Sequence, residues 1–192
     1  KAEKDQDVPR TYLGASMLGD PCARKVQFSY FNVPKDGEGF SGRAYRIFEL
    51  GHILEDVTIA HMRRAGFDLS TINEATGHQH GFSWVNGRIK GHCDGIILDG
   101  PERMGPYPRL FEHKGINAKT FSKYAKEKLE KANPTYYAQC QIYMHAFNLT
   151  DNPAMFVAVC KDNCEYIVKD VHFDAAECQR LIDRAALILQ AC

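Results

Sequence analysis

The order in which apolar periodicity changes along this 192-residue chain is the feature that most constrains its fold. Between about residues 43 and 65, apolar side chains recur at three- and four-residue steps, which predicts a long amphipathic helix closed by Gly66. A short β-prone run and three further ones follow, then two helical segments, two more β-prone runs and a closing helix. This order predicts an α/β fold in which a single domain has a central mixed β-sheet flanked by helices.

The expected strands have clear sequence signals at their ends. Asn86-Gly87 separates two β-prone runs, which is a strong hairpin signal, and the turn-rich residues 100–108 precede the next run. The expected strands are residues 67–72, 81–85, 88–100, 109–114, 155–160 and 166–173.

The other helices are predicted from caps and apolar stripes. Pro134 separates two of them, residues 119–131 and 135–147, and Asn133 is a suitable cap for the second. A short helix is expected from Ser16, and the glycine-rich residues 32–42 are expected to form a loop. The closing helix has an apolar stripe of Cys178, Leu181, Ile182, Ala185 and Leu189.

Composition is that of an ordinary globular protein, with 44% hydrophobic and 25% charged residues. No apolar run approaches the roughly 20 residues that cross a bilayer, so no membrane partner is expected. The polar residues 1–11 are expected to be disordered, and residues 12–192 to form the single domain. Because the charged start has no signal-peptide pattern, the cytoplasm is the expected location.

Seven cysteines raise the question of disulfides or a metal site. An odd number without a secretory context argues against a disulfide framework. Cys160 and Cys164 form the only close pair, and no second close pair completes a four-thiolate site. Reduced, mostly buried cysteines are therefore expected, with a structural zinc or iron–sulfur site as the alternative.

The charge balance does not by itself indicate a nucleic-acid partner. The chain has 24 basic and 24 acidic residues, so its formal net charge is zero. A local excess of lysine nevertheless lies between residues 114 and 131, and it fits either a solvated helix face or a DNA contact. Its members are Lys114, Lys119, Lys123, Lys126, Lys128 and Lys131.

Two neighbouring runs contain acidic residues in a pattern suited to metal chemistry. On the strand that ends near residue 114, alternation places Glu112 and Lys114 on one face and His113 on the other. Asp94 lies between two glycines in an otherwise apolar run, where a carboxylate needs a charged partner or a metal. If the two strands are neighbours, Asp94 and Glu112 converge on one cation beside Lys114.

Such a pair of carboxylates suits Mg²⁺ or Mn²⁺, which prefer oxygen ligands and retain bound water. The ion can lower the pKa of that water and stabilise the oxygens of a phosphodiester during attack. Lys114 would then orient the water or neutralise charge on the phosphate. A lone Glu-x-Lys is also a common surface pair, so the interpretation as a metal site depends on the flanking segments.

The flanking segments resemble the PD-(D/E)XK nucleases. The likeness starts from Gly-His-Cys-Asp-Gly over residues 91–95 and Glu-His-Lys over 112–114, although the proline common near the first acidic residue is absent. Gln-x-x-x-Tyr over 139–143, Gly-x-x-x-Glu over 51–55 and the segment from Ser16 to Arg24 narrow it to RecB-type domains, phage recombination exonucleases and CRISPR-adaptation nucleases. The resemblance implies a restriction-endonuclease-like core.

This resemblance also implies roles for individual residues. Glu55, Asp94, Glu112 and the backbone carbonyl of His113 would hold the metal, and Asp94, Glu112 and Lys114 would form the catalytic trio. Gln139 and Tyr143 share a helix face and would contact DNA or hold Lys114. The full set of expected substrate contacts is Gln139, Tyr143, Arg24 and Lys119.

Several other side chains have a possible functional role that is weighed against a structural one. His52 shares a helix face with Glu55, so it would touch metal or phosphate, or else lie on the surface. His92 shares the strand face of Asp94 and would support the metal ligands. Trp84 is expected in the core rather than under a nucleic-acid base. Cys22, Cys160, Cys164 and Cys178 are poorly grouped for the iron–sulfur cluster of some relatives, so none is expected.

The resemblance therefore predicts a metal-dependent DNA nuclease, an exonuclease of the phage end-resection type that acts in recombination or repair. The alternatives are a CRISPR-adaptation-type nuclease and an inactive DNA-binding module with the same fold. No P-loop is present, so unwinding would need a partner such as a helicase; a single-strand annealing protein is another expected partner. A phage or bacterial host cytoplasm fits this reading. Polarity, exonuclease against endonuclease action, one or two metals, and homo-oligomerisation stay open.

Overall fold

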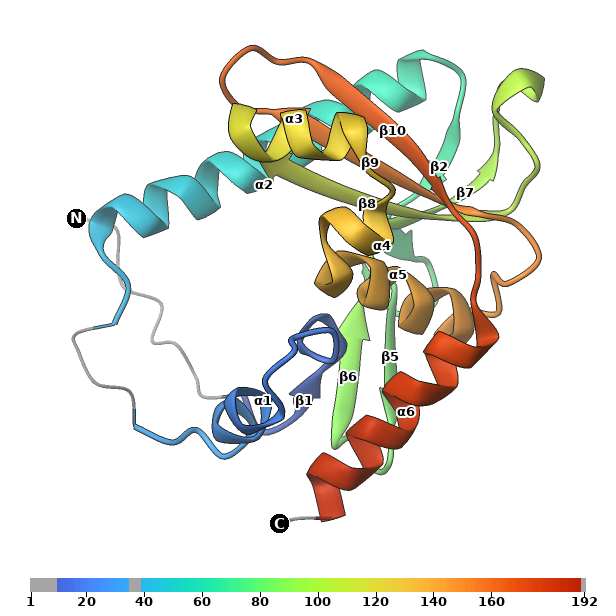
Figure 1. Ribbon diagram of the computed structural model, residues 1–192. Helices are drawn as coiled ribbons and strands as arrows, with labels where there is room; N and C mark the ends of the chain where they lie inside the picture. Colours follow the sequence, from blue (N-terminus) through green and yellow to red (C-terminus); the bar gives the residue numbers. More distant parts are fainter. Residues whose placement is uncertain (1–9, 35–38, 191–192) are drawn as a thin grey trace.

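The computed structural model describes residues 10–34 and 39–190 and shows an α/β fold with a mixed sheet between helices (Figure 1). The central sheet has five strands in the order β10-β9-β8-β7-β2, and only β8 and β9 run parallel. This confirms the predicted fold class. The expected disorder of residues 1–9 lies outside the described residues. The strands are β10 Tyr166–Val171, β9 Ala154–Cys160, β8 Arg109–Ile116, β7 Gly95–Asp99 and β2 Asp68–Ser70.

Helices cover both faces of this sheet. The long helix α2 packs on β8 and β2, whereas α3 and α5 pack on β8, β9 and β10 from the other side. None of the described helices has the length and apolar content that a bilayer crossing requires. The helices are α1 Ala23–Tyr30, α2 Gly42–Arg64, α3 Ala118–Lys126, α4 Leu129–Ala132, α5 Pro134–Ala146 and α6 Ala175–Gln190, with short 3-10 turns Ala15–Met17 (η1) and Glu102–Met104 (η2).

A smaller three-stranded sheet holds the chain's N-terminal segment against the hairpin. Its order is β1-β6-β5, with β1 parallel to β6. A two-stranded sheet, β3-β4, connects it to the central sheet. The strands are β1 Leu13–Gly14, β6 Ile89–His92, β5 Gly81–Trp84, β3 Ile72–Asn73 and β4 His78–Gln79.

The prediction of a single strand over residues 88–100 is wrong. This segment contains two strands, β6 and β7, that belong to different sheets, and the break falls at Cys93 and Asp94. At the break Cys93 donates its amide to His80 O and accepts from Gln79 Nε2, so its backbone groups are satisfied outside either ladder. The chain therefore leaves one sheet and enters the other within two residues.

Smaller differences concern the ends of other elements. The expected strand 67–72 divides into β2 and β3 at Thr71, and the expected helix 119–131 breaks at Glu127 into α3 and α4. The helix expected from Ser16 is a 3-10 turn followed by α1. The cap at Asn133 is confirmed, because its Oδ1 accepts from Tyr136 N at 3.1 Å.

The N-terminal half of α2 extends beyond the sheet (Figure 1). Ser41 caps this helix by accepting from Ala44 N at 3.2 Å. Only its C-terminal half contributes to the core, through Met62 and the buried Thr58. The residue that the sequence assigned to metal binding, Glu55, lies where these two halves meet. The helix therefore presents this carboxylate beside β8, the middle strand of the central sheet.

Candidate active site

Asp94 lies immediately before β7, beside the part of β8 that β7 does not pair with. Pairing between these strands begins with Gly95 opposite Phe111, so β7 has no residue opposite His113. The amide of His113 instead donates to Asp94 Oδ2 at 2.7 Å. The side chain of Asp94 thus takes over a hydrogen bond that a strand backbone would otherwise make.

Glu112 and Lys114 share one face of β8, as alternation predicts. Lys114 Nζ lies 2.5 Å from Glu112 Oε1, 2.8 Å from His113 O and 3.5 Å from Asp94 Oδ2. The fully buried Glu112 also accepts from Gln139 Nε2 at 2.7 Å. The structure therefore brings three of the expected metal-ligand groups around one cationic atom.

The ring of His113 points to the opposite face of β8, as expected. Its Nε2 lies 3.1 Å from Thr58 Oγ1 on α2, and the side chain is buried. Burial lowers the pKa of His113 to about 4, so the imidazole is neutral at ordinary pH. His113 thus links α2 to the strand while its backbone faces Asp94 and Lys114.

Glu55 provides a third carboxylate from α2. It is half-buried and lines two cavities, one of which also contains Asp94 and the other Lys114. Burial, and then the charge of Asp94, raise the pKa of Glu55 to about 7, while Lys114 opposes this shift. Burial and the neighbouring carboxylate thus outweigh the ammonium of Lys114 in setting the pKa of Glu55.

Burial and the neighbouring carboxylates also shift the pKa values of Glu112 and Lys114. Burial, and then the charge of Asp94, raise the pKa of Glu112, although Lys114 opposes the change. Burial lowers the pKa of Lys114, but Glu112 and Asp94 outweigh it and raise the value above the ordinary one. Three carboxylates therefore surround one ammonium, an arrangement that a further cation would stabilise.

The donor set fits a hard divalent cation. Among the residues that the structure describes, no three His, Cys, Asp or Glu side chains are already arranged around one common point. Glu112 Oε2, however, is buried and has no hydrogen-bond partner within residues 10–34 and 39–190. With Asp94, Glu55 and the carbonyl of His113, it offers only oxygen ligands, which Mg²⁺ and Mn²⁺ prefer.

Two cavities lie on either side of this cluster, and Glu55 and His52 line both. The first, called here the Tyr12 cavity, has a volume of about 310 Å³. The second, called here the Lys161 cavity, has a volume of about 400 Å³. The Tyr12 cavity is lined chiefly by Arg10, Tyr12, Ser16, Lys90, Asp94 and Tyr143. The Lys161 cavity is lined chiefly by Gly51, Glu55, Lys114, Gly115, Tyr136 and Lys161.

Sequence reasoning missed the cations of the Tyr12 cavity. Lys90 Nζ lies 5.3 Å from the Tyr12 ring centroid, and the Arg10 guanidinium lies 6.0 Å from it. The parallel pairing of Leu13 with Ile89 brings these segments together. Arg10 falls in the segment expected to be disordered, so no signal pointed to it.

The remaining expected site residues divide into two groups. Gln139, Tyr143 and His92 line the Tyr12 cavity. Arg24 and Lys119 are exposed, on α1 and α3 respectively, and neither lines the two cavities. The structure therefore does not bring Arg24 and Lys119 to the carboxylates.

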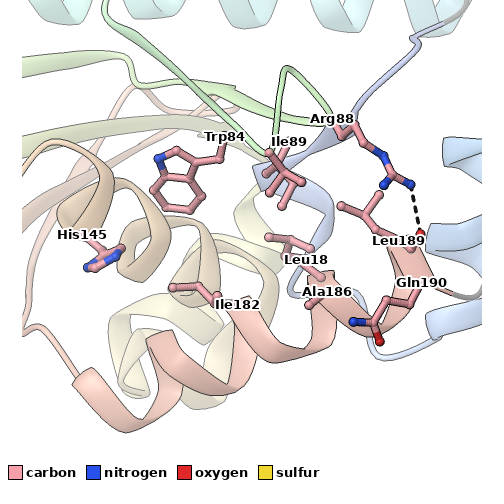
Figure 2. Close-up of a pocket in the computed structure, with 11 residues that line it drawn as sticks. Leu18, Trp84, Arg88, Ile89, His145, Ile182, Ala186, Leu189 and Gln190 are labelled. Atoms are coloured by element: carbon pink, nitrogen blue, oxygen red, sulfur yellow. Dashed lines mark hydrogen bonds between the residues drawn. The ribbon is translucent and has the colours of Figure 1, made fainter.

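A third, apolar cavity of about 420 Å³ lies between the β5–β6 hairpin and α6 (Figure 2). Trp84 lines it and packs on Phe82, with ring centroids 4.4 Å apart. At its rim, Arg88 donates to Leu189 O at 2.9 Å. None of the described residues that line this cavity carries a carboxylate, so it differs from the acidic cluster.

Within residues 10–34 and 39–190, no cysteine forms part of a group of three or more His, Cys, Asp or Glu side chains that could hold a metal. The cysteines of the described residues are free thiols. Cys93 and Cys140 are buried near the site, and burial raises the pKa of each thiol above its ordinary value. Cys22 and Cys164 are exposed. Reactive thiolates are therefore not favoured beside the acidic cluster.

Comparison with known proteins gives a fold but no family. No family model and no curated protein matches the sequence. The structure resembles an alkaline exonuclease, LHK-Exo, from Laribacter hongkongensis, with a TM-score of 0.62 and 14% identity over 95% of this chain and 88% of that one. The same exonuclease in complex with dAMP gives a TM-score of 0.62 and 15% identity, over 94% of this chain and 87% of that one.

A phage-related exonuclease from Haemophilus somnus 129PT is also similar. Its TM-score is 0.54 and its identity 16%, over 93% of this chain and 92% of that one. At such low identity, the two likenesses show a shared fold.

Proposed function

We propose that this chain is a metal-dependent deoxyribonuclease that hydrolyses phosphodiester bonds from a DNA end. The observation that carries the proposal is the convergence of Glu112, Asp94 and the carbonyl of His113 on Lys114 Nζ, at 2.5, 3.5 and 2.8 Å. Glu55 lines both adjoining cavities, and within the described part of the chain Glu112 Oε2 has no hydrogen-bond partner. The fold shared with two exonucleases supports this reading.

Each residue has a role in this proposal. When bound, Mg²⁺ or Mn²⁺ would supply an activated water and would stabilise charge on the phosphate. Glu55, Asp94, Glu112 and the carbonyl of His113 would hold it. Lys114 would orient the attacking water or neutralise developing charge. Gln139 fixes the Glu112 carboxylate through its 2.7 Å hydrogen bond.

The Tyr12 cavity supports action at DNA ends. Arg10 and Lys90 both line it, and among the described residues neither forms an ion pair within 4.0 Å. A terminal phosphate carries about −1.5 to −2 charges at neutral pH, more than the single charge of an internal phosphodiester. Two cations beside the metal ligands therefore favour a terminal phosphate over an internal one.

The exposed Arg24 and Lys119 would contact DNA farther from the reacting bond. From the sequence resemblance we also propose a role in recombination or repair, with a single-strand annealing protein or a helicase as partner.

Cleavage of end-labelled DNA tests the proposed nuclease activity directly. Linear duplex DNA with a 5′-phosphate or a 5′-hydroxyl, and circular DNA, would be incubated with Mg²⁺, Mn²⁺ or EDTA. We expect metal-dependent release of nucleotides from linear DNA only. Lys114→Ala should lower the rate by about 10²- to 10³-fold. The matched control is Lys169→Ala, because Lys169 lies on β10 and lines neither cavity.

Two outcomes would contradict the proposal in different ways. Metal-dependent cleavage that survives Lys114→Ala would exclude the assigned mechanism. DNA binding without cleavage under any metal condition would instead indicate an inactive binding module.

A further inference from the structure

Lys161 follows β9 directly and lies beside the acidic cluster, although no sequence motif marks it. Its amide donates to Ile116 O at 2.7 Å, which extends the parallel pairing of β8 and β9 by one residue. The side chain then lies along β8 and lines the Lys161 cavity together with Lys114. The topology of the sheet therefore places a second cation near the reacting centre.

A glycine on β8 leaves room for the aliphatic part of Lys161. A Cβ atom at Gly115 would lie 3.0 Å from Lys161 Cε and 3.4 Å from Leu54 Cδ1. The lysine side chain therefore occupies space that a side chain at residue 115 would need, between β8 and α2. This close packing fixes the direction of the chain that carries the ammonium group.

Asp162, the acidic residue next to Lys161 in the sequence, has a hydrogen-bond partner other than Lys161. Asp162 Oδ2 accepts from Ala118 N at 2.7 Å, at the start of α3. Within residues 10–34 and 39–190, Lys161 forms no ion pair within 4.0 Å. Lys114, in contrast, is bound by Glu112. Of the two lysines in the cavity, Lys161 is the one not engaged by a carboxylate of the described chain.

We propose that Lys161 binds the DNA phosphate next to the scissile one, on the side away from the strand end. This inference rests on the proposed nuclease function. The two cavities share His52 and Glu55, so the carboxylate cluster lies between them. A strand whose end occupies the Tyr12 cavity, and whose scissile phosphate meets Asp94 and Glu112, continues into the Lys161 cavity. Its next phosphate then meets the ammonium of Lys161.

The role is one of positioning. Lys161 holds the uncut part of the strand, and this contact is equally present before and during bond cleavage. An interaction of that kind acts mainly on substrate affinity and only weakly on the chemical step. Loss of Lys161 should therefore raise KM more than it lowers kcat, unlike loss of Lys114.

The salt dependence of DNA binding tests the phosphate contact. Binding of a 5′-phosphorylated oligonucleotide would be measured with Ca²⁺ in place of Mg²⁺, after checking that no product forms, between about 50 and 200 mM salt. Lys161→Ala should raise Kd roughly tenfold. For Lys161→Ala, the slope of log K against log salt concentration should be smaller in magnitude by about 0.7 to 0.9, which is the value for one phosphate contact. Lys161→Arg should restore most of the affinity and the slope.

Lys169→Ala is the matched control because it removes the same charge from β10, outside both cavities. Its slope should equal that of the wild type. An unchanged slope in Lys161→Ala, with wild-type cleavage intact, would overturn the inference while leaving the nuclease proposal in place. A wild-type protein that neither binds nor cuts DNA would overturn the proposed function and this inference together.

Discussion

The amide of His113 donates to Oδ2 of Asp94 at 2.7 Å, and this bond joins the two chain segments that contribute most of the candidate site. Asp94 lies where the chain passes from the small sheet into the central one, whereas His113 is the middle residue between Glu112 and Lys114. Because β7 begins only at Gly95, a carboxylate rather than a strand backbone satisfies this amide. One hydrogen bond thus both ends the strand pairing and places a negative charge 3.5 Å from Lys114 Nζ.

Asp94→Asn should separate these two roles. The amide oxygen of asparagine can still accept from His113, so the fold should persist with a melting temperature close to that of the wild type. The lost charge should weaken metal binding and lower cleavage by about 10²-fold or more. Cleavage rates and thermal unfolding would be compared with those of Asp99→Asn, at the other end of β7. Wild-type cleavage in Asp94→Asn would refute the assigned role.

Gln139→Leu should weaken the metal site through Glu112. The variant removes the donor that lies 2.7 Å from Glu112 Oε1, so Lys114 is then the one partner of this carboxylate among the described side chains. Loss of such a supporting contact typically costs 10- to 100-fold in metal affinity or activity. Mn²⁺ titration and cleavage rates would measure the change.

Gln141→Leu is the matched control on the same helix. Gln141 is also buried, but it bonds His172 O at 3.1 Å and Asp174 N at 2.7 Å, away from the carboxylates. This variant should lower the free energy of unfolding by about 1–3 kcal/mol and leave Mn²⁺ affinity unchanged. Equal losses of Mn²⁺ affinity in both variants would argue against a specific role for Gln139.

Local patterns predicted part of the candidate site. Strand alternation correctly placed Glu112 and Lys114 together and turned His113 away, because side-chain direction on a strand has a fixed period of two. Helix periodicity likewise placed Gln139 and Tyr143 on one face, and both line the Tyr12 cavity. These relationships involve residues at most four apart, where backbone geometry alone decides.

Relationships between distant segments could not be predicted in this way. Arg10 and Lys90 meet only because β1 pairs with β6, and no local pattern encodes that pairing. The apolar run around Asp94 likewise reads as one strand, because periodicity does not reveal that its two halves join different sheets. Lys161 was missed for the same reason, since its proximity to Gly115 follows from the parallel pairing of β8 and β9.

The raised pKa of Glu55 predicts how pH affects stability without metal. Its value of about 7 in the folded protein exceeds the ordinary 4.5, so the folded state retains a proton that the unfolded chain releases. The protonated Glu55 therefore contributes to the free energy of unfolding fully below about pH 4.5, and this contribution is lost as pH rises to about 7. His113, with a pKa of about 4, acts in the opposite sense below about pH 6.5. A comparison with Glu55→Gln isolates the contribution of Glu55.

In EDTA, Glu55→Gln should therefore gain stability relative to the wild type as pH rises from about 4.5 to about 7. With Mn²⁺ the order should reverse at the upper end, because the ionised carboxylate can bind the metal and the amide binds it poorly. Thermal unfolding of both proteins across this range provides the measurement. A constant difference in melting temperature at every pH, with or without Mn²⁺, would show that Glu55 neither carries the raised pKa nor approaches the metal.

Thr58→Val should loosen α2 from the strand that carries the site. Thr58 Oγ1 donates to Leu54 O at 2.7 Å and lies 3.1 Å from His113 Nε2 and 3.3 Å from Tyr166 OH. Its loss leaves the buried His113 ring without this partner, which should lower the free energy of unfolding by about 1–3 kcal/mol. Since Glu55 lies one turn earlier on α2, Mn²⁺ affinity should fall as well.

Tyr166→Phe is the milder comparison, because its hydroxyl belongs to a side chain that is 42% exposed and water can replace the lost bond. Urea unfolding and Mn²⁺ titration of the two single variants and the double variant would give the coupling between the two hydroxyl groups. If Thr58→Val unfolds at the wild-type urea midpoint and binds Mn²⁺ equally well, the position of Glu55 does not depend on this contact with β8.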